Sequence, residues 1–421
     1  MASVFTSTGK IATTAIVLAL FAGLGPVAFN LAVDPYDRAP VVDLDLYKEK
    51  VSEKAHYPLW KMLRYREREA DLVVLGDSRA RALRDKYWHE LGAGGAFNFA
   101  YGGANIDEIH ATFEHIKTDP EIKTLVVGIQ LRSFDIDHKA GQNRVPEAIR
   151  LANNPFEYYS SWFVSKIGWR NLAARYPDVT TAIADLRPRL VQPARAAAPA
   201  PSDLARISES CGCVFLETRT GTYGRGYLGR TRHWDGLDHW SGIFDINVVD
   251  RDLPEVYARQ VTKNARSDWR SFNFEEQLWE KVAAIADWAS ENDVHLIFVI
   301  PPTITEMQQQ IESYGLAEAN LNFRLRLAHL APVVDFDYDN HLTRDLSRFT
   351  DAYHFNSKVA RLLVGETLQV ADADSMAARS AHLARADIAC PVHASDQTRE
   401  ISDDLVTMRE GTACRIWRAA E

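Results

Sequence analysis

The stretch that decides the fold is DLVVLGDSR, residues 71–79. A short apolar run ends in a polar turn that contains Ser78, and a helical pattern begins soon after it. The run is typical of a buried strand, and ligands in open α/β sheets bind at the carboxyl ends of such strands. The following helix N-terminus supplies backbone N–H groups and the positive end of its dipole. The stretch therefore predicts an α/β fold with Ser78 as a candidate nucleophile.

Four further apolar runs predict strands at 96–99, 124–129, 294–300 and 333–336. Helical patterns alternate with them near 80–91, 104–117, 274–291, 316–330 and 357–370. This alternation predicts a three-layer α/β/α domain with a mainly parallel five-stranded sheet, of the flavodoxin-like kind.

A long aromatic-rich segment, about 135–273, interrupts the pattern after the third strand, and it contains a Pro/Ala-rich stretch at 193–201. It is too long for a plain loop, so we expect either a cap over the sheet edge or a small subdomain. Its tryptophans and tyrosines are candidates for stacking on sugar rings or for packing in a core. We divide the chain into 1–33, a connecting segment 34–70, a domain 71–371 and a C-terminal extension 372–421.

Residues 11–33 contain no charged side chain, and as a helix they would reach about 35 Å, enough to cross a bilayer core. Lys10 precedes this run, whereas Asp34, Asp37 and Asp43 follow it. The sequence therefore predicts an N-terminal transmembrane helix in the inner (cytoplasmic) membrane, with the main domain in the periplasm or outside the cell. A cleaved signal peptide is the alternative.

The 421 residues carry a net charge of −9 and contain no block of Lys or Arg residues, so nothing in the composition indicates a nucleic-acid partner. Four cysteines fit an oxidising compartment, and Cys390 and Cys414 are spaced for a disulfide. Cys211 and Cys213 could form a second, strained disulfide or could be two free thiols. Acidic and histidine residues at 135–138 and 233–239 lack a supporting helix register, so we predict no metal.

A base for Ser78 is available near the other end of the chain, where Asp351 and His354 precede the last predicted helix. A serine hydroxyl is a weak nucleophile and needs such a base, and imidazole titrates near neutral pH. Asp351 would fix the tautomer of His354 and stabilise the imidazolium. We predict His354 Nε2 within about 4 Å of Ser78 Oγ, with Asp351 on the Nδ1 side.

A tetrahedral intermediate would also need hydrogen-bond donors for its negative oxygen. The candidates are the backbone N–H groups of Ser78 and of Gly102 or Gly103, the side chain of Gln130, and Asn105 as an alternative donor. Arg79 and Arg132 lie beside the predicted site in sequence and are candidates for contacts with an anionic substrate.

The motifs Leu-Gly-Asp-Ser-Arg (75–79), Asn-Phe-Ala-Tyr-Gly-Gly (98–103) and Asp-x-x-His (351–354) occur in this order. Together they resemble the SGNH (GDSL-type) hydrolase superfamily, in particular its membrane-anchored bacterial branch, whose members acylate or deacylate cell-surface polysaccharides and teichoic acids. The resemblance covers about 71–135 and 274–370. The third motif departs from the usual Gly-x-Asn-Asp, because this chain has Gly128-Ile-Gln130-Leu131.

The resemblance implies serine-dependent transfer or hydrolysis of O-acyl groups on a cell-surface or extracellular polysaccharide, with acetyl as the expected acyl group. The reaction would pass through an acyl-enzyme and need no cofactor. If the reaction is transfer, a multi-span membrane protein is the expected source of the acyl group. The alternative is a catalytically inactive SGNH-like scaffold that binds polysaccharide or supports an export complex, and Gln130 and Leu131 keep that alternative open.

Overall fold

The computed structural model describes residues 25–39, 42–136, 143–178, 217–218, 221–222, 253–371, 398–401, 406–410 and 414–419. The chain forms two compact units, of which one comprises residues 1–175 and 251–421 and the other residues 176–250. In the second unit the described residues form an antiparallel pair, β4 (Glu217–Thr218) and β5 (Gly221–Thr222). The expected insertion at 135–273 therefore contributes its two ends to the first unit.

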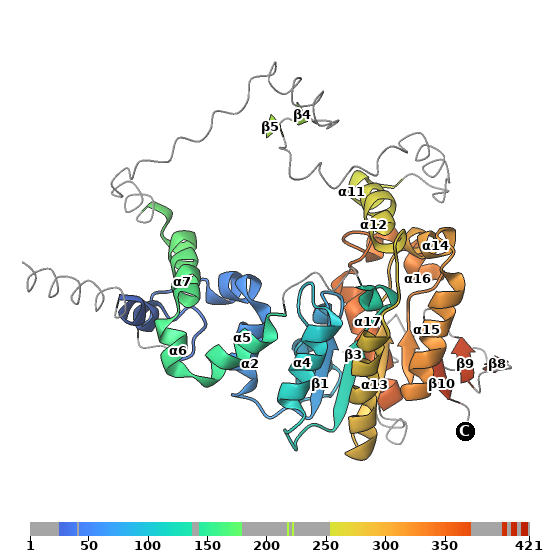
Figure 1. Ribbon diagram of the computed structural model, residues 1–421, viewed down its shortest axis with the longest axis horizontal. Coiled ribbons are helices and arrows are strands. Elements are labelled where there is room, and N and C mark those ends of the chain that lie inside the picture. The colour runs from blue at the N-terminus through green and yellow to red at the C-terminus, as the bar shows by residue number, and fades with distance from the viewer. Residues whose placement is uncertain are drawn as a thin grey trace, which may run out of the picture. The chain divides into compact units, whose positions relative to one another are not determined.

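The first unit is built on an eight-stranded sheet in the order β2-β1-β3-β6-β7-β10-β9-β8 (Figure 1). Five strands are parallel: β1 (Leu72–Gly76), β2 (Ala96–Asn98), β3 (Thr124–Gly128), β6 (His295–Ile300) and β7 (Val333–Asp335). These are the five predicted strands, so the α/β class with a mostly parallel sheet is confirmed.

The predicted limit of five strands is wrong, because the C-terminal extension adds three more. They are β8 (Thr398–Ile401), β9 (Val406–Glu410) and β10 (Arg415–Ala419), all paired antiparallel. β10 pairs with β7 and so covers an edge that the parallel sheet would otherwise leave open.

Helices lie on both sides of the parallel strands, which is consistent with a three-layer fold. In the sheet, β2 lies on one side of β1, whereas β3, β6 and β7 follow one another on the other side. The connection from β1 to β2 therefore runs in one direction across the sheet, and the connections from β2 to β3, β3 to β6 and β6 to β7 run in the opposite direction. Right-handed crossovers therefore put the helix after β1 on one face and the helices after β2, β3 and β6 on the other. The first face carries α3 (Asp85–Glu90) and α17 (Ser357–Ala371), which contact each other, and the second carries α4 (Ile106–Ile116), α13 (Glu276–Glu291) and α15 (Ala317–Leu330).

Further elements belong to the same unit. Before β2 they are η1 (Glu49–Glu53), α2 (Tyr57–Tyr65) and η2 (Ala80–Ala82). Between β3 and α13 they are η3 (Leu131–Phe134), α5 (Val145–Asn153), α6 (Pro155–Ser160), α7 (Trp162–Arg175), α11 (Glu255–Arg259), η6 (Gln260–Asn264) and α12 (Ala265–Trp269). After β6 they are α14 (Thr305–Ser313), α16 (His341–Arg344) and η7 (Leu346–Arg348).

The helix predicted at 80–91 is broken into η2 and α3. Asn98 donates from its amide nitrogen to the carbonyls of Ala80 (2.8 Å) and Leu83 (2.7 Å), and Trp88 Nε1 also donates to Leu83 O (3.0 Å). Because these side chains take carbonyls that a continuous helix would use, the chain extends at Arg84 before α3 begins.

The C-terminal end of the predicted membrane span is helical over residues 25–33 and packs on the first unit. Asn30 is fully buried and donates to the carbonyls of Tyr159 (2.7 Å) and Ser161 (3.0 Å). Gly168 of α7 leaves room for this helix, because a Cβ there would lie 2.9 Å from the ring of Phe29. Residues 11–24 of the predicted span lie outside the described ranges. Within those ranges, we find no helix that has both the length and the apolar composition to cross a bilayer.

His56 makes the stability of the first unit depend on pH. Its Nδ1 caps α2 by accepting from the N–H of Leu59 (3.1 Å), and its side chain is buried beside the ring of Phe163. Burial, followed by the charge of Arg144, lowers the pKa of His56 from 6.5 to about 4. The unfolded chain therefore protonates His56 more readily than the folded chain does. The contribution of the neutral, buried ring to the free energy of unfolding is fully present above about pH 6.5 and is lost as the pH falls towards 4.

We expect the free energy of unfolding to fall by about 3 kcal/mol over that window through this one group. Urea unfolding between pH 4 and pH 7.5 measures the change. The variant His56→Asn keeps a capping acceptor but has no titrating ring. Its free energy of unfolding should therefore fall by about 3 kcal/mol less than that of the natural protein between pH 7.5 and pH 4. Identical pH profiles for the two proteins would contradict the prediction.

Candidate active site

Ser78 sits on a tight turn at the carboxyl end of β1. Gly76 has a φ of 142°, and a Cβ there would lie 2.6 Å from Cβ of Ala80 and 2.7 Å from the carbonyl oxygen of Gly128. Only glycine fits this close approach between β1, β3 and the turn. Asp77 then accepts from the N–H of Arg79 through its side chain (2.8 Å), which fixes the turn. The Ser78 side chain is left half-buried at the sheet edge.

His354 reaches the same point from the loop before α17. Its Nε2 lies 2.9 Å from Ser78 Oγ, which confirms the predicted approach of two residues that are 276 positions apart. Thr350 holds the loop, because its N–H (2.7 Å) and its hydroxyl (3.0 Å) both donate to the carbonyl of His354. The imidazole side chain is 41% exposed, so the Ser78–His354 pair faces solvent.

Asp351 lies on the Nδ1 side of the ring, as predicted. Its carboxylate oxygens are 2.8 and 3.0 Å from His354 Nδ1, and one of them also accepts from the backbone N–H groups of Tyr353 (2.8 Å) and His354 (3.0 Å). Burial alone would raise the pKa of Asp351, but these hydrogen bonds hold the pKa below its ordinary value. An ionised Asp351 requires a proton on Nδ1, which leaves Nε2 free to accept the proton of Ser78.

The loop after β2 supplies backbone donors next to the Ser78 turn. Tyr101 donates its N–H to the carbonyl of Gly76 (3.0 Å), which sets the loop beside β1. Arg144 donates to the carbonyl of Gly102 (3.2 Å), and the N–H of Gly103 belongs to the same planar peptide and so points the opposite way. Within the described ranges, the N–H groups of Ser78 and Gly103 have no protein acceptor. Both are available to a developing oxyanion.

The two predicted side-chain donors have different surroundings. Gln130 is almost buried, and its Nε2 donates to Asp77 Oδ2 (2.8 Å). This bond to a carboxylate uses one of the two N–H groups of the Gln130 amide and steadies the turn that carries Ser78, so a role of Gln130 as an oxyanion donor stays a prediction that depends on its second N–H group. Asn105 caps α4 through its side-chain oxygen, which accepts from the N–H of Glu108 (2.9 Å), so only its amide nitrogen remains as a donor.

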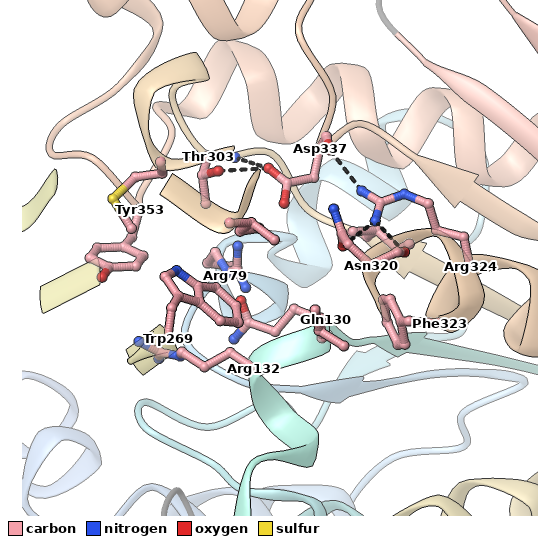
Figure 2. A pocket seen from close by; sticks show the side chains of 14 residues that line it. Arg79, Gln130, Arg132, Trp269, Thr303, Asn320, Phe323, Arg324, Asp337 and Tyr353 are labelled. Carbon is pink, nitrogen blue, oxygen red and sulfur yellow. Dashed lines mark hydrogen bonds between the residues drawn. The ribbon is translucent and has the colours of Figure 1, made fainter. Parts of the chain in front are cut away.

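Arg79 and Arg132 line a small chamber instead of the surface around Ser78 (Figure 2). The chamber has about 20 Å³ of free space, enough for a single water molecule. Arg79 is 3% exposed and donates to the carbonyl of Pro301 (3.3 Å), while Arg132 pairs with Asp268 (2.7 Å). The predicted substrate contact is therefore wrong for Arg79, which is buried, and stays a prediction for Arg132, whose side chain is partly exposed and already paired with a carboxylate.

Tyr353 joins the loop that carries Asp351 and His354 to α12, and no pattern in the sequence predicts this contact. Its hydroxyl donates to Asp268 Oδ2 (3.0 Å), and burial followed by the charge of Asp268 raises the pKa of the Tyr353 hydroxyl. The hydroxyl therefore stays protonated and keeps donating at neutral pH. This bond holds the segment between Asp351 and His354 in place.

Ser78 and His354 open into a surface cleft of about 660 Å³. Its other charged lining residues are all basic, and they are Arg81, Arg84, Lys86 and Arg361. This cluster was not predicted from the sequence, although three of the four residues follow Ser78 within eight positions. The spacing of basic residues after the nucleophile was the signal that could have found it.

The described residues contain no group of three or more His, Cys, Asp or Glu side chains able to hold a metal. Asp135 instead accepts from the backbone N–H of Asn273 (3.1 Å), while 137–138 and 233–239 lie outside the described ranges. Cys414 is buried and disulfide-bonded, but Cys390, its predicted partner, also lies outside those ranges, as do Cys211 and Cys213.

The fold and this site define a class: an α/β protein with a Ser-His-Asp arrangement at the carboxyl edge of a parallel sheet. Comparison with protein-family models gives no match, and comparison with curated proteins gives none either.

Proposed function

We propose that this protein is a serine-dependent acyl-transfer enzyme of the SGNH type. It transfers or hydrolyses O-acyl groups on a cell-surface or extracellular polysaccharide, and acetyl is the acyl group we expect. The observation that carries the proposal is the continuous path from Ser78 Oγ through His354 to Asp351, with distances of 2.9 and 2.8 Å. The order of the sequence motifs and the parallel sheet are in keeping with it.

In the proposed mechanism, Ser78 Oγ attacks the carbonyl carbon of the ester, and its proton passes to His354 Nε2. Asp351 stabilises the imidazolium. The N–H groups of Ser78 and Gly103 donate to the oxygen that becomes negative. His354 then gives its proton to the departing alkoxide, which leaves an acyl-enzyme on Ser78. Water or a sugar hydroxyl attacks the acyl-enzyme by the same steps in reverse, so the acceptor alone separates hydrolysis from transfer.

The openness of the site supports a polymeric substrate. His354 is 41% exposed and the cleft lies on the surface, so an ester carried on a long chain can reach Ser78. An enclosed pocket that buries most of its ligand would favour a free small molecule instead. An N-terminal membrane anchor ahead of the helix at residues 25–33 would hold this site close to a multi-span protein that supplies the acyl group.

A fluorophosphonate probe tests the nucleophile directly. We expect the full chain to be labelled on Ser78, and the variant Ser78→Ala to keep the fold and lose labelling. Ser313→Ala, a change on an exposed serine at the end of α14, is the matched control and should be labelled like the natural protein. A folded protein that stays unlabelled between pH 6 and pH 9 would contradict the proposal and favour a polysaccharide-binding scaffold without catalysis.

A further inference from the structure

The cleft at Ser78 is unusual in its charge. The chain as a whole carries −9, yet the lining of this cleft combines Ser78 and His354 with four cationic side chains and no carboxylate. Like charges that share one depression repel each other, so folding alone gives no reason to gather them. The gathering is useful if a negatively charged ligand occupies the cleft.

Two of the four cations are already neutralised in part. Arg361 pairs with Glu90 (3.0 Å), and Arg81 lies 3.8 Å from Glu53. In contrast, Arg84 and Lys86 are exposed and have no ion-pair partner in the described part of the chain. These two side chains are the cations that remain for a ligand.

The cleft also continues along the surface into a depression of mixed charge. Arg81, Arg84 and Lys86 line a second depression of about 850 Å³ as well, which runs toward α2 and contains both acidic and basic residues. A pocket for a single small ligand usually measures about 300–1,000 Å³, and the two depressions together exceed that range. Their shared wall is suited to an extended ligand that passes across the Ser78 site.

We propose that the substrate is an anionic glycan, a chain with carboxylate or phosphodiester groups, and that Arg84 and Lys86 bind its charges next to the ester attacked by Ser78. This proposal rests on the proposed function and specifies its substrate class. Arg84 can pair with two oxygens of one anionic group, while Lys86 acts as a point charge. Together they draw the chain into the cleft and position it over the Ser78–His354 pair.

The test compares acetylated glycans of equal length: a polyuronate, a phosphodiester-linked chain and a neutral glucan. We expect the natural protein to show kcat/KM at least 10-fold higher for one or both anionic chains than for the neutral one. In Arg84→Gln/Lys86→Gln this ratio should fall by about 2- to 25-fold, since one exposed charge contributes about 1.4- to 5-fold. Raising the salt from 0.05 to 0.5 M should reduce the ratio in the natural protein.

Two variants serve as controls. Lys117→Gln/Lys123→Gln makes the same change in net charge at the opposite edge of the sheet, before β3, and should leave the ratio unchanged. Arg84→Lys/Lys86→Arg keeps both charges and should retain most of the preference. Equal kcat/KM for anionic and neutral glycans would overturn the proposal, as would a ratio that falls equally in the Lys117 and Lys123 control.

Binding to the Ser78→Ala protein separates this proposal from the proposed function. Tight binding of an anionic glycan that depends on Arg84 and Lys86, without any ester turnover by the natural protein, supports the ligand class while the enzymatic function fails. Turnover without charge preference preserves the enzyme and overturns the ligand class. Equal binding of double-stranded DNA or of anionic lipid vesicles would also overturn it, because the cleft would then select charge and not glycan.

Discussion

Replacing His354 by asparagine is expected to lower kcat for ester hydrolysis or acyl transfer by about 10⁴- to 10⁶-fold. The imidazole is the only group with a nitrogen at hydrogen-bond distance from Ser78 Oγ in the described part of the chain. Without it, the hydroxyl has no acceptor for its proton and the leaving alkoxide has no donor. The carbonyl of residue 354 still accepts from Thr350, so the loop should keep its shape. Steady-state rates with an acetyl ester measure the loss.

Asp351→Asn provides the graded comparison. An asparagine can still accept from the N–H groups of Tyr353 and His354, but it offers no charge to the imidazolium and disfavours the tautomer with the proton on Nδ1. We expect a smaller loss in kcat, about 10²- to 10⁴-fold. The three residues act as a unit, so Ser78→Ala combined with His354→Asn should be no slower than Ser78→Ala alone. Losses that multiply in the double variant would contradict the shared mechanism.

Replacing Arg324 by methionine is expected to destabilise the fold by about 3–5 kcal/mol. Arg324 of α15 donates to Asp335 at the end of β7 (2.8 Å), and the two side chains are only 7% and 0% exposed. Trp417 of β10 also donates to the carboxylate of Asp335 (3.3 Å). Removing the cation leaves a buried negative charge at the point where β7, α15 and the C-terminal strand meet. Urea unfolding of the natural and variant proteins measures the change.

The double variant Arg324→Met/Asp335→Asn tests this explanation. It removes the charge together with its partner, so it should recover at least half of the lost stability. Lys117→Met breaks the exposed pair with Glu114 (2.8 Å) and should cost no more than about 0.5 kcal/mol. A double variant that is no more stable than Arg324→Met would show that the loss comes from packing and not from an unpaired charge.

Several features of the site could be predicted because they depend on local chemistry. Gly76 and Ser78 follow an apolar run, and that pattern alone places a strand, a tight turn and an exposed hydroxyl in order. Asp351 and His354 are three residues apart in one loop, so the hydrogen bond between them is a local contact. Their approach to Ser78 also followed from sequence, because parallel strands bring their carboxyl ends to one edge.

The roles of the polar residues around Ser78 could not be predicted in the same way. Arg79 follows Ser78 directly and Gln130 follows the end of the neighbouring strand β3, yet one side chain is buried against Pro301 and the other bonds Asp77. Which acceptor a long polar side chain reaches depends on burial and on neighbours from distant elements, which no local pattern records. For the same reason, the free cations of the cleft, Arg84 and Lys86, became evident only when their carboxylate neighbours were located.

The sequence by itself determined the class of the protein, the order of its five parallel strands along the chain and the three residues of the Ser-His-Asp arrangement, because hydrophobic periodicity and turn chemistry act over a few residues. The tertiary structure alone decided that the C-terminal extension continues the sheet beyond β7, that residues 25–33 pack against α7 and that Arg84 and Lys86 lie beside Ser78 with no ion-pair partner in the described part of the chain. These features depend on contacts between segments roughly 80 or more residues apart or on the absence of a partner. Both are properties of the folded arrangement and leave no periodic trace in the chain.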